Sequence, residues 1–108
     1  MVIDTSAVLA WLKNEPERER IVSALEAHEV CRISAVSLLE ANIVVRAREH
    51  PAMPGKLQRF LEEIGAIVMP FDEQQARLAN DASQRYGKGQ GHPAQLNMGD
   101  CAVYALAK

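Results

Sequence analysis

The sequence predicts a single domain of the α/β class, built around a short parallel sheet. The chain has 108 residues, of which 48% are hydrophobic and 24% charged, an ordinary composition for one globular domain. Short apolar segments alternate along it with longer segments in which apolar residues recur at helical spacing. This alternation is typical of parallel strands joined by crossover helices. In such sheets the functional site lies beyond the carboxyl ends of the strands.

Three short apolar segments are the predicted strands, namely residues 2–3, 30–33 and 66–69. The first of them, residues 2–3, is apolar throughout, as suits a parallel strand that is buried on both faces. Three strands make a thin sheet, and an apolar helix like the last one here normally packs on a sheet that continues. We therefore expect one domain, residues 1–108, that lacks its last strand or strands or needs a partner.

Helices are predicted between the first two strands and after the second. The first helix covers residues 5–13, and Pro16 suits the first position of a second helix, residues 16–27. Ser34 can cap a long helix that runs to about residue 49. The segment around Pro51 and Pro54 is expected to be a loop.

The clearest amphipathic helix lies before the third strand. Its apolar residues Leu57, Phe60, Leu61 and Ile64 fall at positions i, i+3, i+4 and i+7, and Gly65 ends it. The rest of the chain is predicted as a helix over residues 73–86 capped by Asp72, a glycine-rich loop over residues 87–93, and a last helix that begins near Asp100.

Three carboxylates are the candidate functional residues. Asp4 follows the first strand, Glu40 lies inside the most apolar helical stretch, and Asp100 leads into the last apolar helix. An acid at the exit of a strand and two more at or in apolar helices could converge on one cleft. Mg²⁺ commonly binds through one or two carboxylates together with waters and substrate phosphate. The pattern therefore points to metal-assisted phosphoryl chemistry.

Each of these acids also has a purely structural interpretation. Asp4 and Asp100 could be helix caps, which satisfy free backbone N–H groups. Glu40 has no cation three or four residues away on its own helix. Because an unpaired carboxylate in apolar surroundings is costly, it needs a partner from elsewhere, either an Arg or Lys side chain or a metal ion.

Several polar residues are weaker candidates for substrate contacts. Thr5 and Ser6 could cap a helix or support a metal-bound water or phosphate, and Asn97 could be a turn residue or orient substrate. The glycine-rich loop lacks the spacing of a phosphate-binding P-loop and is expected to be a mobile surface loop. The basic residues in and beside it could still contact a phosphate backbone; they are Arg85, Lys88 and His92.

Charge and cysteine content exclude several classes of protein. The formal net charge of −2 argues against a simple nucleic-acid-binding module, although not against a nuclease, because metal ions reverse the sign of an acidic site. No apolar stretch is long enough to span a membrane, and no signal peptide is visible. Cys31 and Cys101 suggest buried, reduced thiols in a cytoplasmic protein, and the histidines show no zinc-ligand spacing.

Three motifs in the chain resemble those of a known family. Residues 2–7, Val-Ile-Asp-Thr-Ser-Ala, resemble the opening of the PIN-domain ribonucleases, and residues 33–41 look like their second acidic motif. Residues 86–89, 92–94 and 96–107 resemble the third, in the form carried by VapC-type toxins of bacterial toxin–antitoxin pairs. Each motif is short, but three in this order and at fitting spacings make a strong resemblance over essentially the whole chain.

The resemblance implies a three-layer α/β/α fold and an endoribonuclease that depends on Mg²⁺ or Mn²⁺. Carried over by position, Asp4, Glu40 and Asp100 would be its catalytic and metal-binding residues. It also implies a cytoplasmic protein that acts on RNA, binds a small cognate antitoxin and forms a homodimer. Family members usually continue into a further strand with a further acidic residue, and neither Asp72 nor Asp81 occupies a matching place.

Two other functions remain open from the sequence. One is a truncated PIN domain that binds its antitoxin but cleaves RNA weakly or not at all. The other is an α/β metallophosphatase that acts on small phosphate esters with the same acids. The chain shows no recognisable nucleophile motif for the latter.

Overall fold

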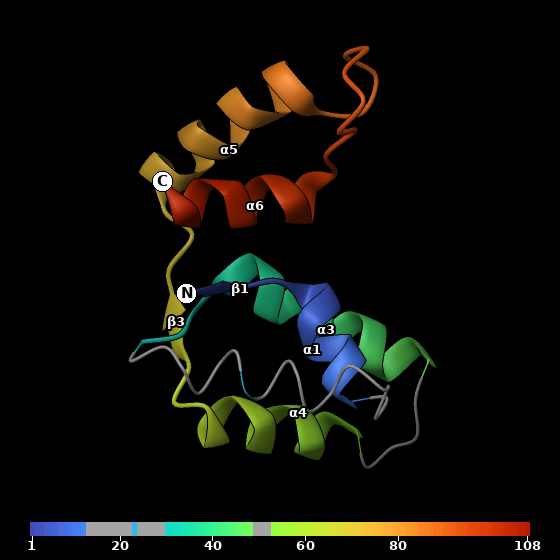
Figure 1. Cartoon of the computed structure of the whole chain (residues 1–108), viewed down its shortest axis with the longest axis vertical. Coiled ribbons are helices and arrows are strands. Elements are labelled where there is room, and N and C mark those ends of the chain that lie inside the picture. The colour runs from blue at the N-terminus through green and yellow to red at the C-terminus, as the bar shows by residue number, and fades with distance from the viewer. Residues whose placement is uncertain (13–22, 24–29, 49–52) are drawn as a thin grey trace.

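Three parallel strands form one sheet in the computed structural model of the chain, with the order β1-β2-β3 (Figure 1). The strands are β1 (Val2–Ile3), β2 (Arg32–Ser34) and β3 (Ile67–Met69). Ile3 lies opposite Ile33, which in turn lies opposite Val68. The structure describes residues 1–12, 23, 30–48 and 53–108. Within them, the predicted parallel sheet is confirmed.

Helices flank the sheet in the part of the chain that the structure describes. Figure 1 shows α4 at one end of the molecule and the pair α5 and α6 at the other, with the sheet between them. None of the described helices is long and apolar enough to cross a membrane. The helix predicted for residues 16–27 lies almost wholly outside the described residues. The helices are α1 (Thr5–Leu12), α3 (Ala35–Arg48), α4 (Met53–Glu63), α5 (Glu73–Tyr86) and α6 (Met98–Ala107).

Most helix ends follow the predicted capping residues. The backbone N–H of Val36 donates to the Ser34 hydroxyl oxygen at 3.2 Å, and Asp72 accepts from the backbone N–H of Gln75 at 3.0 Å. Gly65 follows α4 with φ +63°, a left-handed conformation that favours glycine. These local signals were therefore sufficient to place the starts of α3 and α5 and the end of α4.

Two predicted boundaries are wrong. The last helix begins at Met98 rather than near Asp100, because Asn97 is its N-cap and forms a reciprocal capping box with Asp100. The predicted loop around Pro54 is already helical, since α4 begins at Met53. A proline in the first turn of a helix is tolerated because the N–H group that it lacks has no helical partner there.

The core consists of two apolar clusters. The larger one packs the sheet against α1, α3 and α4, and Val8, Ile33 and Phe60 in it are almost fully buried. The smaller one joins α5 to α6 through Ala79, Ala82, Cys101 and Ala105. Helix α6 also contacts β1, β2 and α3. It therefore connects the two clusters and brings its N-terminal turn to the carboxyl end of β1.

Candidate active site

The structure brings Asp4, Glu40 and Asp100 to one cavity of about 280 Å³. They reach it from three separate parts of the chain: the junction of β1 and α1, the middle of α3, and the first turn of α6. The cavity lies beyond the carboxyl end of β1, where a site in a parallel sheet is expected. Its lining residues are Asp4, Thr5, Ser6, Leu9, Glu40, Val44, Asn97, Gly99, Asp100 and Val103.

Asp4 is both a helix cap and a wall of this cavity. Its Oδ1 atom accepts hydrogen bonds from the Ser6 hydroxyl at 2.9 Å and from the backbone N–H of Ala7 at 2.8 Å. Its Oδ2 atom accepts none from the residues that the structure describes. Because a carboxylate has two acceptor oxygens, the capping role leaves one of them for a ligand.

Asp100, like Asp4, uses only one carboxylate oxygen in helix capping. Oδ2 accepts from the backbone N–H of Asn97 at 3.0 Å, while the side-chain oxygen of Asn97 accepts from the backbone N–H of Asp100 at 2.8 Å. This reciprocal pair fixes the carboxylate at the exposed first turn of α6. No described residue donates a hydrogen bond to Oδ1, so that oxygen is also available to a ligand.

Glu40 has neither a hydrogen bond nor an ion pair with the described part of the chain. Its half-buried carboxylate lies against Gly99, where a Cβ atom would be 2.6 Å from Oε2 and 2.9 Å from Oε1. The carboxylate therefore sits beside the first turn of α6, whose N-terminal dipole favours negative charge. That environment compensates part of its charge without a cation.

The lining of the cavity fits a hard divalent cation. Its described lining residues provide three carboxylates, two hydroxyl groups and one amide, and none of these described residues is Lys, Arg or His. Such cations take oxygen ligands, and Mg²⁺ usually retains several of its waters. Within the described residues, no three acidic, His or Cys side chains are close enough together to enclose an ion. The acids thus line the wall of the cavity without enclosing an ion.

The hydroxyl and amide side chains of the cavity also have structural partners. Thr5 donates from Oγ1 to the backbone oxygen of Ser37 at 3.4 Å, which ties α1 to α3. Ser6 donates to Asp4, and the Asn97 side-chain oxygen caps α6. All three line the cavity, in the same wall as the acids.

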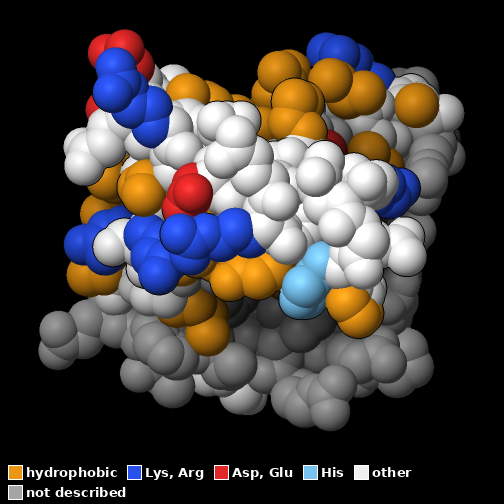
Figure 2. All heavy atoms as spheres, turned by 90° about the horizontal axis from the view of Figure 1, so that it is seen from above, with side chains coloured by type: hydrophobic (Ala, Val, Ile, Leu, Met, Phe, Trp, Pro, Cys, Tyr) orange, Lys and Arg blue, Asp and Glu red, His pale blue; other side chains and the backbone are white. Residues whose placement is uncertain are grey.

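The basic candidates lie away from the acids. Arg85 pairs with Asp81 at 3.6 Å, and both side chains are largely exposed. The His92 ring packs edge-on against Tyr86, with ring centroids 4.9 Å apart. Figure 2 looks down on the end of the molecule formed by α5 and shows acidic and basic side chains close together there. Neither Arg85 nor His92 is among the residues that line the acidic cavity.

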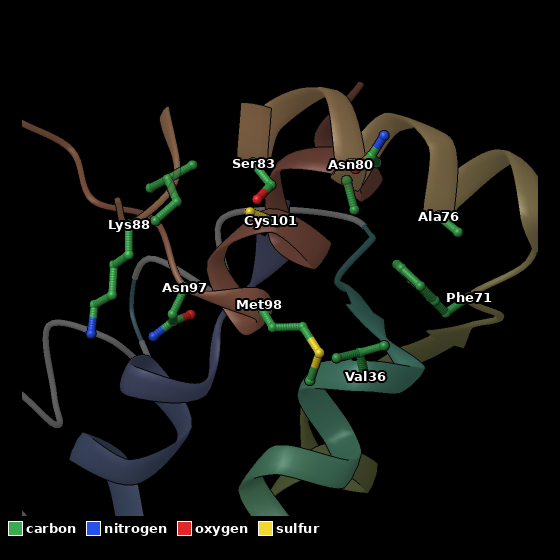
Figure 3. Close-up of a pocket in the computed structure, with 11 residues that line it drawn as sticks. Val36, Phe71, Ala76, Asn80, Ser83, Lys88, Asn97, Met98 and Cys101 are labelled. Carbon is green, nitrogen blue, oxygen red and sulfur yellow. The ribbon is translucent and has the colours of Figure 1, made fainter. Parts of the chain in front are cut away.

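Lys88 lines a second cavity of about 550 Å³, which shares Asn97 with the first (Figure 3). Most of its wall is apolar, and Figure 3 shows the Met98 side chain extending toward Val36. No local pattern in the sequence predicts this cavity, because its lining comes from α3, α5, α6 and the loops beside them. The lining residues are Val36, Phe71, Ala76, Ala79, Asn80, Ser83, Lys88, Leu96, Asn97, Met98 and Cys101.

Cys101 lies at the wall of this second cavity, beside Ser83 (Figure 3). Burial raises the pKa of the Cys101 thiol above its ordinary value of 9.0, the negative charge of Asp100 raises it further, and a hydrogen bond with Ser83 opposes both effects. A thiol with a raised pKa stays protonated near neutral pH and is a poor nucleophile. Cys101 is therefore a packing residue of α6.

Comparison with known proteins places the chain in a family. The model of the PIN domain matches residues 1–108. The chain is 44% identical to VapC ribonuclease Mb0625 of Mycobacterium bovis over 99% of its own length and 80% of that protein. It is 41% identical to ribonuclease VapC30 and 38% identical to ribonuclease VapC42, both of Mycobacterium tuberculosis, over its whole length and 82% of each. The chain belongs to the PIN domain family and is a relative of the VapC ribonucleases.

Proposed function

We propose that this chain is a metal-dependent endoribonuclease of the VapC toxin type, which hydrolyses phosphodiester bonds in RNA. The observation that carries the proposal is the convergence of Asp4, Glu40 and Asp100 on one cavity, with no Lys or Arg among its described lining residues. The names of the relatives, which are ribonucleases, support the reaction class. Their similarity extends over essentially the whole chain.

The three acids would hold Mg²⁺ or Mn²⁺ between them. Asp4 and Asp100 would each offer the oxygen that is not engaged in helix capping, and Glu40 would offer either of its oxygens. Such an ion, when bound, activates water as a nucleophile and stabilises charge on the attacked phosphate. The capping hydrogen bonds orient Asp4 and Asp100 before any ligand arrives, which reduces the cost of assembling the site.

The rest of the cavity would position the phosphate. The hydroxyl of Ser6 and the amide nitrogen of Asn97 lie in the same lining and can approach a phosphate oxygen. The acids repel RNA when no cation is bound, so binding at this cavity and cleavage both require the ion. Lys88, at the neighbouring cavity, is a candidate contact for the RNA backbone, as are Arg85 and His92 farther along the same surface.

Protein partners form part of the same proposal. A VapC-type chain would be silenced by a small cognate antitoxin and would associate with a second copy of itself. Large apolar side chains are exposed on α3 and α6: Leu39 is 58% exposed, Ile43 48% and Met98 80%. Exposed apolar side chains of this size favour association with another protein surface.

The test is cleavage of a labelled RNA mixture by the purified chain with Mg²⁺, with Mn²⁺ and with EDTA. We expect cleavage only with a metal ion, and a loss of about 100-fold or more in Asp4→Asn, Glu40→Gln and Asp100→Asn. Asparagine is an effective cap residue, so the fold should survive in Asp4→Asn, which circular dichroism would verify.

Glu73→Gln is the matched control, because Glu73 is an exposed acid of α5 that pairs with Arg77 outside the cavity. It should cleave RNA like the unmodified chain. Cleavage that persists in EDTA, or that survives all three cavity substitutions, would contradict the proposal. A folded chain that binds an antitoxin but does not cleave RNA would instead favour the inactive, antitoxin-binding alternative.

A further inference from the structure

Gly99 occupies a helical position where the backbone does not require glycine. It is the second residue of α6, and its φ is not in the left-handed region, unlike those of Gly65, Gly89 and Gly91. Glycine is a poor helix former, so a helix that starts with it loses stability relative to one with alanine there. Some contact outside the helix must therefore make a side chain at this position unfavourable.

That contact is the Glu40 carboxylate. A Cβ atom at Gly99 would lie 2.6 Å from Oε2, 2.9 Å from Oε1 and 3.0 Å from Cδ, all atoms of the Glu40 side chain. These three atoms are the nearest neighbours of the site, and Gly99 itself is buried. The space that an alanine methyl group would fill is thus occupied by a functional group of the acidic cavity.

We propose that Gly99 is a positioning residue for the metal site, which lets the Glu40 carboxylate lie across the first turn of α6 beside Asp100. The inference rests on the proposed function, because it assigns Gly99 a role in forming that site. Gly99 would act through Glu40 and would contact neither the ion nor the RNA.

The geometry separates this role from a structural one. The atoms that a methyl group would meet belong to the end of a flexible, half-buried side chain rather than to backbone. Glu40 can turn its carboxylate away at little cost to packing, and alanine favours the helix. Gly99→Ala should therefore leave the fold stable while it moves Glu40 away from Asp100.

The test measures Mn²⁺ binding to the folded chain without RNA, by calorimetry or by electron paramagnetic resonance. We expect Gly99→Ala to bind Mn²⁺ about 10- to 100-fold more weakly, as is typical when a group that orients a metal ligand is changed. Its melting temperature should stay equal to or above that of the unmodified chain. The matched control is Gly55→Ala, because Gly55 is another helical glycine, with no atom near its absent Cβ; its Mn²⁺ affinity should be unchanged.

A second substitution distinguishes displacement of Glu40 from other effects of the methyl group. Aspartate is one methylene shorter, so Glu40→Asp withdraws the carboxylate from the space beside residue 99. Alone, this change should weaken Mn²⁺ binding; combined with Gly99→Ala, it should cause no further loss or should restore part of the affinity. Such non-additivity is expected of residues in direct contact. If the loss of Mn²⁺ affinity in the double variant equals the product of the losses in the two single variants, the inference is overturned.

The outcomes also separate this inference from the proposed function. If the unmodified chain binds no Mn²⁺, or Asp4→Asn binds it equally well, the proposed metal site itself fails. If the unmodified chain binds Mn²⁺, Asp4→Asn does not, and Gly99→Ala binds like the unmodified chain, then only the role of Gly99 is refuted.

Discussion

Single side chains at this site serve two purposes at once. Asp4 and Asp100 each hold a helix terminus with one oxygen, and both residues line the cavity. A capping role and a ligand role, which are alternatives when only the sequence is considered, are thus compatible in the structure. Glu40 differs, because no hydrogen bond from the described residues fixes it and its position depends on the space beside Gly99.

The thiol of Cys101 makes stability depend on pH in alkaline solution. Because its pKa is raised in the folded chain, the thiol ionises first in the unfolded chain as the pH rises past 9.0. Ionisation then stabilises the unfolded state. The contribution of the protonated thiol to the free energy of unfolding is therefore complete below pH 9 and is lost as the pH rises above it. The loss is at most about 1.4 kcal/mol per pH unit for one group.

We therefore expect the free energy of unfolding, from urea titrations at pH 7.5 and 10, to fall more in the unmodified chain than in Cys101→Ala. Tyrosines and lysines titrate in both proteins, so the difference between the two isolates the thiol. An equal fall in the two proteins would show that Cys101 does not contribute.

At the scale of the helix and strand, nearby residues in the sequence predicted helix ends and an amphipathic helix that the structure contains. The Asp72 cap, the amphipathic spacing around Phe60 and the terminal Gly65 are each encoded within one turn of chain, and the structure places them as predicted. Asn97 was missed as a cap because Gly99-Asp100 is itself a common start signal, and the capping box includes both Asn97 and Asp100.

Contacts between elements could not be predicted in the same way. That Asp4, Glu40 and Asp100 face one cavity follows from the packing of α1, α3 and α6, which the strand-end rule only suggested. The Glu40 carboxylate lies against Gly99 only because α3 and α6, which are far apart in the sequence, pack close together. The apolar cavity beside Lys88 likewise arises only when α5 and α6 pack together.

Two glycines of the α4 region should respond oppositely to the same substitution. Gly65 follows the helix with φ +63°, so Gly65→Ala should lower the free energy of unfolding by about 1 kcal/mol. Gly55 lies inside the helix with open space around it, so Gly55→Ala should raise it by up to about 1 kcal/mol. Urea unfolding of both variants would measure the difference, and effects of the same sign would contradict the assignment of the helix end at Gly65.

At the scale of the whole molecule, two apolar cores meet at one helix. The core of α5 and α6 adjoins the core of the sheet through α6, which contacts β1, β2 and α3 and also carries Asp100 and Gly99. The acidic cavity lies where α6 meets β1 and α3. Its shape therefore depends on how the pair α5 and α6 packs against the sheet and its other helices. Apolar side chains remain exposed on the outer face of α3, at Leu39 and Ile43 one turn apart.

This exposed face of α3 is where we expect a second copy of the chain to bind. Sedimentation of the unmodified chain at micromolar concentration should show a dimer, and Leu39→Lys should shift it to monomer while circular dichroism shows that the chain is still folded. Gln58→Lys, which adds the same charge on the exposed face of α4, should leave the dimer intact. A dimer that persists in Leu39→Lys would place the contact elsewhere.

The combination of helix capping and proposed metal binding in the Asp4 carboxylate has an evolutionary consequence. Because asparagine caps a helix about as well as aspartate, exchange of one oxygen for an NH₂ group would remove the proposed metal ligand while the helix terminus remains satisfied. The same argument holds at Asp100, where an amide oxygen can still accept from the N–H of Asn97. Selection against the proposed ribonuclease activity would thus accumulate inactive copies that remain folded and still bind the proposed antitoxin.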